Sequence, residues 1–178
     1  MSGVSVALPD APAVHLVQAM PKGKKLDQIV RMTTELGVDA VHLAISERAI
    51  SRPDASKIGG KLARLEKLAR EASRQARRRT VPKIHPPASL VDVAKRASDD
   101  AIRLVFWEAA SEFLPRELAR GADVWVVVGP EGGLSHTEAR ELAASGYKPV
   151  RIGQTILRVQ SAAPTALALV LDRVGRFG

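Results

Sequence analysis

The sequence contains no cysteine, which excludes both a disulfide framework and a thiolate metal site. Its four histidines, His15, His42, His85 and His136, do not have the spacing of metal ligands, and we expect no metal. Aromatic residues make up only 3% of the chain. This scarcity argues against a platform of stacked bases of the kind found in single-strand-binding proteins.

Long hydrophobic runs are also missing. No stretch approaches the roughly eighteen apolar residues of a membrane helix, and the first residues lack the basic start and apolar core of a signal peptide. We therefore expect a soluble cytoplasmic protein without membrane contact. Positive charge, by contrast, is in excess. The formal net charge is +8 and the pI is near 10.3, which indicates an anionic partner, and structured RNA fits better than a stacked single strand.

The stretch 123–165 has the pattern of two strands that each end in a glycine loop. Residues 124–128 form a short run of β-prone side chains, which predicts a strand covered on both faces. It ends in GPEGG at 129–133, where missing side chains allow a sharp turn or a close approach of a ligand. Ser135 and Glu138 have capping-box spacing, so a helix is expected to begin there and to end at the next glycine.

A second strand is expected at 149–152, and it ends on Gly153. The loop at 154–158 then leads into a helix from about 160 to 174. Because ligands bind at the carboxyl ends of the strands in open α/β sheets, both glycine loops are expected at that edge. The plainer alternative, that they are ordinary turns between strand and helix, stays open at this point.

The rest of the chain reads as an α/β scaffold. Further strands are expected at 14–19, 40–45, 81–84 and 102–106, and further helices at 26–36, 57–79 and 90–95. A strand, a helix and another strand in succession predict a parallel sheet with helices on both faces. We expect one domain at 13–178 after a flexible leader at 1–12, because 46% hydrophobic residues suffice for a single core.

Basic residues concentrate between Lys57 and Lys83. The segment has ten basic residues against the two acids Glu66 and Glu71, a local balance of +8. Apolar residues recur there at steps of three and four, so the basic side chains fall on the opposite face of a long helix. A basic face is often only solvated surface, but this concentration favours contact with phosphates.

The motifs together resemble one family. GPEGG followed by S-x-x-E and later by I-G-x-x-I-L-R closely resembles the RsmE-type methyltransferases of the SPOUT class. QAMPKGKK at 18–25 and EASRQARR at 71–78 resemble two further family segments. The resemblance implies methylation of N3 of a uridine in small-subunit (16S) ribosomal RNA, S-adenosylmethionine as cofactor, a homodimer and a C-terminal trefoil knot. General topology rules alone predict an unknotted doubly wound sheet.

The resemblance also implies the site residues. Cofactor contacts are expected from the two glycine loops and from an acid after the fourth strand, namely Glu108, Val128, Gly129, Pro130, Glu131, Gly132, Gly133, Ile152, Gly153, Ile156 and Leu157. Catalytic roles are expected for Arg158 and Glu131, and RNA contacts for Lys22, Arg74, Gln75, Arg77 and Arg78. At Gly132 a β-branched side chain is expected to fill space that the ligand needs.

For several of these residues a second role is also possible from the sequence alone. Arg158 is the cation best placed to stabilise the charge that spreads over uridine when N3 loses its proton, but it could instead cap a helix or bind phosphate. Glu108 could instead be the first acid of a helix at 109–118. The general base is unassigned, with Glu131, Glu108 and water as candidates.

The chain departs from the family pattern in two places. Gln160 stands where the family more often has an acid, so a carboxylate role is not carried over there. Family members also usually begin with a PUA-like barrel, and this chain is expected to start where that barrel ends. Two other functions remain: a SPOUT methyltransferase with another RNA target, and a non-catalytic RNA-binding protein. A phosphate-binding loop is disfavoured because GPEGG lacks the Lys-Ser/Thr of a P-loop.

Overall fold

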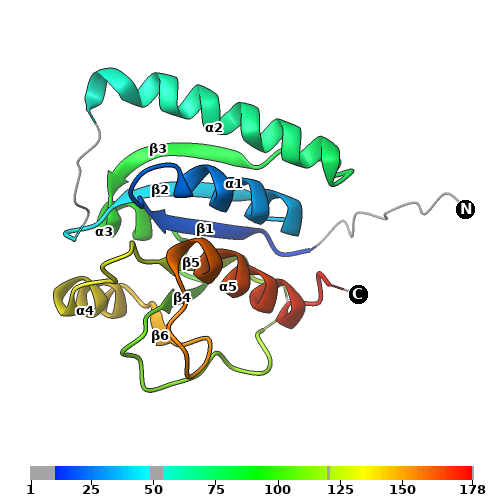
Figure 1. The fold of residues 1–178 in the computed structure, drawn as a ribbon. Helices are drawn as coiled ribbons and strands as arrows, with labels where there is room; N and C mark the ends of the chain where they lie inside the picture. The colour runs from blue at the N-terminus through cyan, green and yellow to red at the C-terminus, as the bar shows by residue number, and fades with distance from the viewer. Residues whose placement is uncertain (1–10, 49–53, 120, 178) are drawn as a thin grey trace, which may run out of the picture.

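The computed structural model describes residues 11–48, 54–119 and 121–177, so the first ten residues of the expected leader lie outside the described residues. Six strands form a sheet in the order β3-β2-β1-β5-β4-β6 (Figure 1). The strands are β1 (Val14–Ala19), β2 (Ala40–Ile45), β3 (Lys83–Ser89), β4 (Ile102–Phe106), β5 (Val124–Val128) and β6 (Lys148–Val150). The helices are α1 (Lys25–Leu36), α2 (Ala55–Gln75), α3 (Leu90–Ala94), α4 (His136–Ala144) and α5 (Val159–Arg173).

The sheet is parallel and has helices on both faces, as predicted. In β5, Val124, Val126 and Val128 belong to a core shared with α1, α2 and α5. Trp125 and Val127 belong to a second core shared with α3 and α4. Because successive side chains of a strand point to opposite faces, a strand between two such layers must be apolar throughout.

The predicted strands at 14–19, 40–45, 102–106 and 124–128 are confirmed. The third strand was misjudged, because β3 starts at Lys83 and continues to Ser89 through two prolines. Proline removes a donor from the hydrogen-bond ladder, and this is tolerated on an edge strand that has a neighbour on one side only.

The long basic helix ends earlier than predicted, at Gln75 instead of 79. Arg77 has a φ of 54°, which lies in the left-handed region. The Arg78 N–H donates to the Ser73 carbonyl at 2.9 Å and the Arg77 N–H to the Arg74 carbonyl at 3.1 Å, the bonds of a Schellman motif. A non-glycine residue in the left-handed region gives little sequence signal, which is why the helix end was missed.

The strand order changes direction between β1 and β5. From β1 the chain continues outward to β2 and β3, whereas β4, β5 and β6 lie on the other side of β1. In open α/β sheets, ligands bind outside the carboxyl ends of the strands at such a switch point. All strands point toward the side of Figure 1 where α4 lies. The loops after β1 and β5 therefore flank the expected ligand position.

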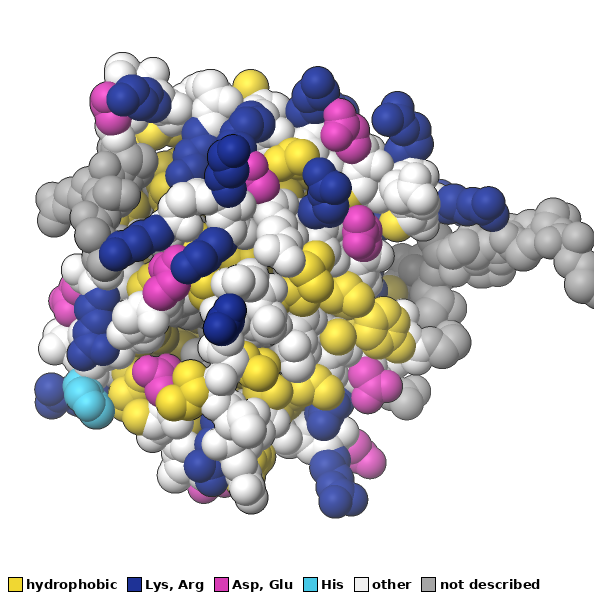
Figure 2. All heavy atoms as spheres, in the orientation of Figure 1, with side chains coloured by type: hydrophobic (Ala, Val, Ile, Leu, Met, Phe, Trp, Pro, Cys, Tyr) yellow, Lys and Arg dark blue, Asp and Glu magenta, His cyan; other side chains and the backbone are white. Residues whose placement is uncertain are grey.

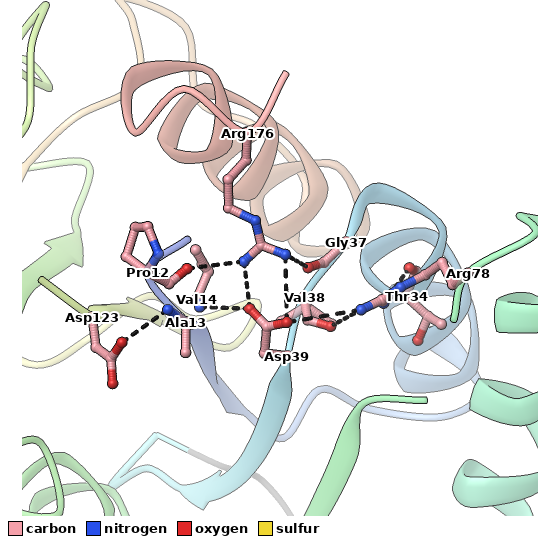
Figure 3. Close-up of polar contacts among 10 residues, drawn as sticks. All are labelled: Pro12, Ala13, Val14, Thr34, Gly37, Val38, Asp39, Arg78, Asp123 and Arg176. Atoms are coloured by element: carbon pink, nitrogen blue, oxygen red, sulfur yellow. Dashed lines mark hydrogen bonds and ion pairs between the residues drawn. The ribbon is translucent and has the colours of Figure 1, made fainter. Parts of the chain in front are cut away.

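The opposite edge of the sheet is held by a polar network around Asp39 (Figure 3). The Asp39 carboxylate accepts hydrogen bonds from the Val14 N–H, at 2.8 Å, and from the Arg176 guanidinium. Arg176 also donates to the carbonyls of Pro12 and Gly37, both at 3.1 Å. These bonds attach the segment after α5 to the start of the sheet, far along the strands from the glycine loops.

Among the described residues, no helix is both long enough and apolar enough to cross a membrane.

Candidate ligand site at the carboxyl edge of the sheet

A cavity of about 500 Å³ opens at the switch point, between the GPEGG loop and the loop before α5. Of the residues predicted to contact the cofactor, its lining includes Glu108, Val128, Gly129, Pro130, Glu131, Gly133, Ile156 and Leu157. An adjoining cavity of about 120 Å³ shares part of this lining and adds Ile152 and Gly153. The parallel topology thus brings the two glycine loops together, and their individual ligand contacts stay predictions.

Gly133 is the glycine on which the loop geometry depends. Its φ is +65°, and a Cβ built there would lie 2.4 Å from Oε1 of Glu108. Gly129 is also tightly surrounded, because its Cβ would lie 3.1 Å from Cγ of Leu134. A side chain at Gly133 would therefore be strained by the left-handed φ, and one at Gly129 would require Leu134 to shift.

The expectation that the turn needs a special backbone conformation at Gly132 is wrong, and the contact of Gly132 with the cofactor stays a prediction. A Cβ at Gly132 would meet only Arg48, at an ordinary contact distance of 3.7 Å, and its φ lies outside the left-handed range. Gly132 is also absent from the lining of both cavities. Its carbonyl accepts a hydrogen bond from Nη1 of Arg48 at 2.9 Å, so its backbone faces the β2 side of the loop.

Glu131 ties the glycine loop to the loop after β1. Its carboxylate accepts hydrogen bonds from the Lys22 N–H at 3.0 Å and from Nζ of Lys25 at 2.8 Å. Partial burial would raise the pKa of Glu131, but the hydrogen bonds from Lys25 and from backbone N–H groups outweigh it and lower the pKa. An ionised carboxylate held by a lysine is a poor proton acceptor. We therefore revise the catalytic role of Glu131 to that of a loop anchor.

A second anchor, which sequence reasoning missed, joins the end of β2 to the start of α4. Glu138 is only 2% exposed and completes the predicted capping box with Ser135. Its carboxylate also accepts from the Glu47 N–H at 2.9 Å and from Oγ of Ser46 at 3.2 Å. The S-x-x-E pattern identifies the cap, but no local signal shows that the same carboxylate binds a segment some ninety residues away.

Glu108 lies at the end of β4, exposed, and lines both cavities. The alternative role as the first acid of a helix at 109–118 is wrong, because the structure describes these residues without a helix. Their backbone bonds run instead to Arg151. The Arg151 N–H donates to the Glu112 carbonyl at 2.9 Å, and the Leu114 N–H donates to the Arg151 carbonyl at 3.1 Å.

Arg158 occupies the N-cap position of α5, but its side chain makes no capping hydrogen bond. The capping alternative is therefore wrong. The side chain is exposed, lines the main cavity and forms no hydrogen bond or ion pair with any described residue. Gln160, which replaces the family's acid, lines the same cavity.

The residues predicted to contact RNA separate into two groups. Arg74, Gln75 and Arg77 are exposed at the end of α2, and Figure 2 shows basic side chains gathered over the part of the surface where Figure 1 draws this helix. Lys22 is exposed in the loop after β1.

Arg78 does not fit the prediction. Its guanidinium donates to the carbonyls of Thr34 at 2.7 Å and Val38 at 2.8 Å, and it faces Asp39 (Figure 3). Burial lowers the pKa of Arg78, and the nearby Asp39 opposes this shift. The side chain is a structural link between the end of α2 and the turn after α1, so it is not available to phosphates.

Three of the four histidines come together on the sheet face that carries α3 and α4. His42 and His85 stack with ring centroids 4.2 Å apart, and His15 stacks on Trp125 at 4.5 Å. Nδ1 of His15 lies 3.2 Å from Nε2 of His42. No group of three or more His, Asp or Glu side chains in the described ranges is arranged to hold a metal ion.

This histidine stack is expected to make the fold sensitive to acid. Burial, followed by the nearby His85 and His15, lowers the pKa of His42 to about 3, and burial lowers the pKa of His15 and His85. The unfolded chain therefore takes up a proton near pH 6.5 that folded His42 does not accept until near pH 3. The neutral ring stabilises the fold above pH 6.5, and this contribution is lost as the pH falls.

We expect the free energy of unfolding to fall by about 2 kcal/mol between pH 7 and pH 5 through His42 alone. Urea unfolding at pH 7, 6 and 5 measures it. In His42→Phe, which keeps a flat ring, stability should depend less steeply on pH. Equal pH dependence of the two proteins would contradict the role assigned to His42.

The chemistry available at the cavity is positioning and charge stabilisation. Its described lining offers apolar walls, backbone groups of two loops, the carboxylates of Glu108 and Glu131, the ammonium of Lys25, which is paired with Glu131, and the guanidinium of Arg158. No serine, cysteine or histidine is among these lining residues, so the lining supplies none of the commonest covalent nucleophiles.

The chain is similar to known RNA methyltransferases. A curated relative, the ribosomal RNA small subunit methyltransferase E of Mycobacterium tuberculosis, is 30% identical over 167 residues, which are 91% of this chain and 64% of that protein. The chain thus spans just under two thirds of that relative. The crystal structure of ribosomal RNA small subunit methyltransferase E from Neisseria gonorrhoeae, bound to S-adenosyl methionine, superposes with a TM-score of 0.83 at 26% identity and covers 90% of this chain and 66% of that chain.

A putative methyltransferase from Legionella pneumophila, in complex with the bound cofactor SAM, gives a TM-score of 0.82 at 28% identity over 91% of this chain and 66% of that chain. The predicted SPOUT methyltransferase fold is confirmed by these likenesses, and the trefoil knot within it stays a prediction. The family model of the RNA methyltransferase domain matches residues 9–171. This chain belongs to the RNA methyltransferase domain family.

Proposed function

We propose that this chain catalyses transfer of a methyl group from S-adenosylmethionine to N3 of a uridine in 16S ribosomal RNA. The observation that carries the proposal is the cavity at the switch point. Gly133, with its left-handed φ, faces Glu108 there. Arg158 lines the same cavity, and its side chain is not bonded to any described residue. The names of the relatives support a small-subunit ribosomal RNA substrate.

The residues present fit the cofactor. A cavity of about 500 Å³ has the size of a site for a nucleoside-sized ligand. Gly129 and Gly133 carry no side chains that cover the loop, so backbone N–H and C=O groups of the two loops are accessible to adenine and ribose. Glu108 adds a carboxylate that accepts hydrogen bonds from hydroxyl groups.

When bound, S-adenosylmethionine supplies an electrophilic methyl group on a sulfonium. The protein then has to hold the acceptor atom in line with that group and to exclude water. Uridine N3 becomes nucleophilic only after losing its proton, and the resulting charge spreads over the flanking carbonyl oxygens. Arg158 presents two or more N–H donors to such oxygens and stabilises the charge in the transition state. Glu108 is the remaining carboxylate candidate for the general base, with water as the alternative.

Calorimetric titration with S-adenosylhomocysteine tests the proposal. We expect saturable binding of one molecule per chain, which a purely RNA-binding protein has no reason to show. Mass spectrometry of nucleosides from ribosomal RNA of a deletion strain then identifies the target, and loss of 3-methyluridine is the expected result. Loss of a different methylated nucleoside would instead support a SPOUT methyltransferase with another RNA target.

The proposal includes a homodimer that works in the cytoplasm. Figure 2 shows hydrophobic side chains gathered over the region where Figure 1 draws α1 and α5. Leu36 and Leu169 are among the partly buried residues of these helices. Partly exposed apolar side chains on two neighbouring helices support contact with a second copy.

RNA affinity is proposed to depend on the exposed end of α2. Replacing Arg74 and Arg77 by glutamine should reduce the slope of log affinity against log salt by about 1.4 to 1.8, because each lost phosphate contact removes about 0.7 to 0.9. Filter binding to a 16S fragment at several salt concentrations measures the slope.

Arg78→Ala is the matched control in the same short segment. Because Arg78 bonds to Thr34 and Val38, its loss should cost about 2 kcal/mol of stability while the salt slope stays unchanged. A reduced slope in Arg78→Ala, or an unchanged slope in the double variant, would mean that RNA binds another surface.

A further inference from the structure

A second hollow lies on the face of the sheet that carries α4. It has a volume of about 330 Å³ and is lined by Trp107, His136, Ala139, Arg140, Ala143 and Pro149. The four α4 residues are spaced i, i+3, i+4 and i+7, so they form one face of the helix. Two of the four are alanines, and their short side chains leave the helix surface recessed opposite Trp107 and Pro149.

The lining of this hollow combines an aromatic ring with a cation, in a chain that has few aromatic residues. The chain has two tryptophans, of which Trp125 is only 5% exposed whereas Trp107 is partly buried and packs against the core of α3 and α4 with part of its surface accessible. The Trp107 ring meets the His136 ring edge to face, with centroids 5.2 Å apart and an interplanar angle of 84°. Arg140 is the charged residue among the described lining, which has no carboxylate. An aromatic surface beside a cation suits a flat, anionic ligand.

The position of the hollow connects it to the main site. Trp107 immediately precedes Glu108 at the end of β4, and it also lines the smaller cavity that adjoins the main one. The side chain of Trp107 packs toward the core of α3 and α4, on the other face of the sheet from α5. The hollow therefore shares Trp107 with the cavity beside the main site, within reach of a nucleotide next to one bound there.

We propose that this hollow binds one nucleotide of the RNA substrate next to the target, with the base stacked on Trp107 and the phosphate facing Arg140. The inference rests on the proposed function, because it needs RNA at the main site. Single-stranded RNA is read through unstacked bases that stack on aromatic or guanidinium planes. A single stacking position is also compatible with a chain that is poor in aromatic residues, since it requires only one aromatic side chain and not a row of them.

Two variants separate stacking from charge. Trp107→Leu should weaken binding of a short single-stranded RNA by about 10-fold, the scale of one lost stacking contact, with an unchanged salt slope. Arg140→Gln should reduce the salt slope by about 0.7. Phe177→Leu is the matched control, because Phe177 is an exposed aromatic outside the hollow, 43% accessible, and its loss should leave RNA affinity unchanged.

Fluorescence gives an independent readout. In Trp125→Phe the emission comes from Trp107, so RNA should quench it and protect it from acrylamide. Should Trp125→Phe fail to fold, the affinities of Trp107→Leu, with folding verified by circular dichroism, test the proposal in the parent background.

The outcomes distinguish this proposal from the proposed function. Absence of S-adenosylhomocysteine binding would overturn the function, whatever Trp107 does. Normal S-adenosylhomocysteine binding together with parental RNA affinity in Trp107→Leu would overturn the stacking site alone. The hollow would be a protein contact if Trp107→Leu kept its RNA affinity but changed from dimer to monomer in light scattering.

Discussion

Replacing Gly133 by alanine is expected to weaken binding of S-adenosylmethionine by about 100-fold. The φ of +65° at Gly133 costs an alanine about 1 kcal/mol or more. The new Cβ would also lie 2.4 Å from Oε1 of Glu108, so the Glu108 carboxylate must leave its place at the cavity. A lost hydrogen bond to a charged group costs about 1.5 to 3 kcal/mol of binding free energy, which at its upper end is about 100-fold, whereas the backbone strain lowers the stability of the free and the bound protein alike.

The adjacent glycine provides the control. Gly132→Ala places its Cβ in ordinary contact with Arg48 at 3.7 Å, without a left-handed φ, so affinity should stay within about threefold of the parent. Gly133→Asn separates the two causes, because asparagine tolerates the left-handed region but still displaces Glu108. Calorimetry on the three variants gives the comparison. Equal losses at Gly132 and Gly133 would show that the loop as a whole, and not the approach to Glu108, determines affinity.

The sheet could be predicted from the sequence because each strand carries its own signal. The run at 124–128 is apolar at every position, and an apolar layer covers each of its faces. The start of α4 could also be predicted, because Ser135 and Glu138 form the reciprocal hydrogen bonds of a capping box three residues apart. Local chemistry determines these features, so the sequence is sufficient to find them.

The two adjacent glycines show a backbone conformation that could not be predicted from the sequence. Gly132 and Gly133 look identical in the motif, but only Gly133 of this pair has a positive φ and faces a carboxylate from β4. Which of the two takes the left-handed conformation depends on how the loop packs against segments distant in the chain. The sequence identifies the loop, and the structure identifies the residue.

The contacts of Arg78 and of the histidine stack could not be predicted for a related reason. Arg78 stands next to Arg77 in a basic run, yet its partners Thr34 and Val38 lie about forty residues earlier. His15, His42 and His85 have no ligand spacing in the sequence, yet strand register sets His42 opposite His85, and His15 lies on the same sheet face two residues before Val17, the partner of His42. Contacts made by strand register and helix packing leave no mark in local spacing.

The second large effect is expected from Arg158→Ala. The affinity for S-adenosylmethionine should stay within about threefold of the parent, but the rate of methyl transfer should fall by about 100-fold or more. This is the scale of the loss of one preorganised charge-stabilising group. The side chain forms no bond with the described residues, so its removal leaves no partner there unsatisfied. It lines the cavity without anchoring either glycine loop, in contrast to Glu131 and Glu138. We therefore expect the cofactor affinity of Arg158→Ala to stay close to that of the parent.

Single-turnover methylation of a 16S fragment, alongside calorimetry, measures the two quantities separately. Arg158→Lys keeps the charge but loses the planar fork of donors, so it should recover only part of the rate. Arg116→Ala removes an exposed arginine that lines neither cavity and should behave as the parent. Equal losses of affinity and turnover in Arg158→Ala would make Arg158 a binding residue, because an interaction formed only in the transition state lowers the rate without lowering cofactor affinity.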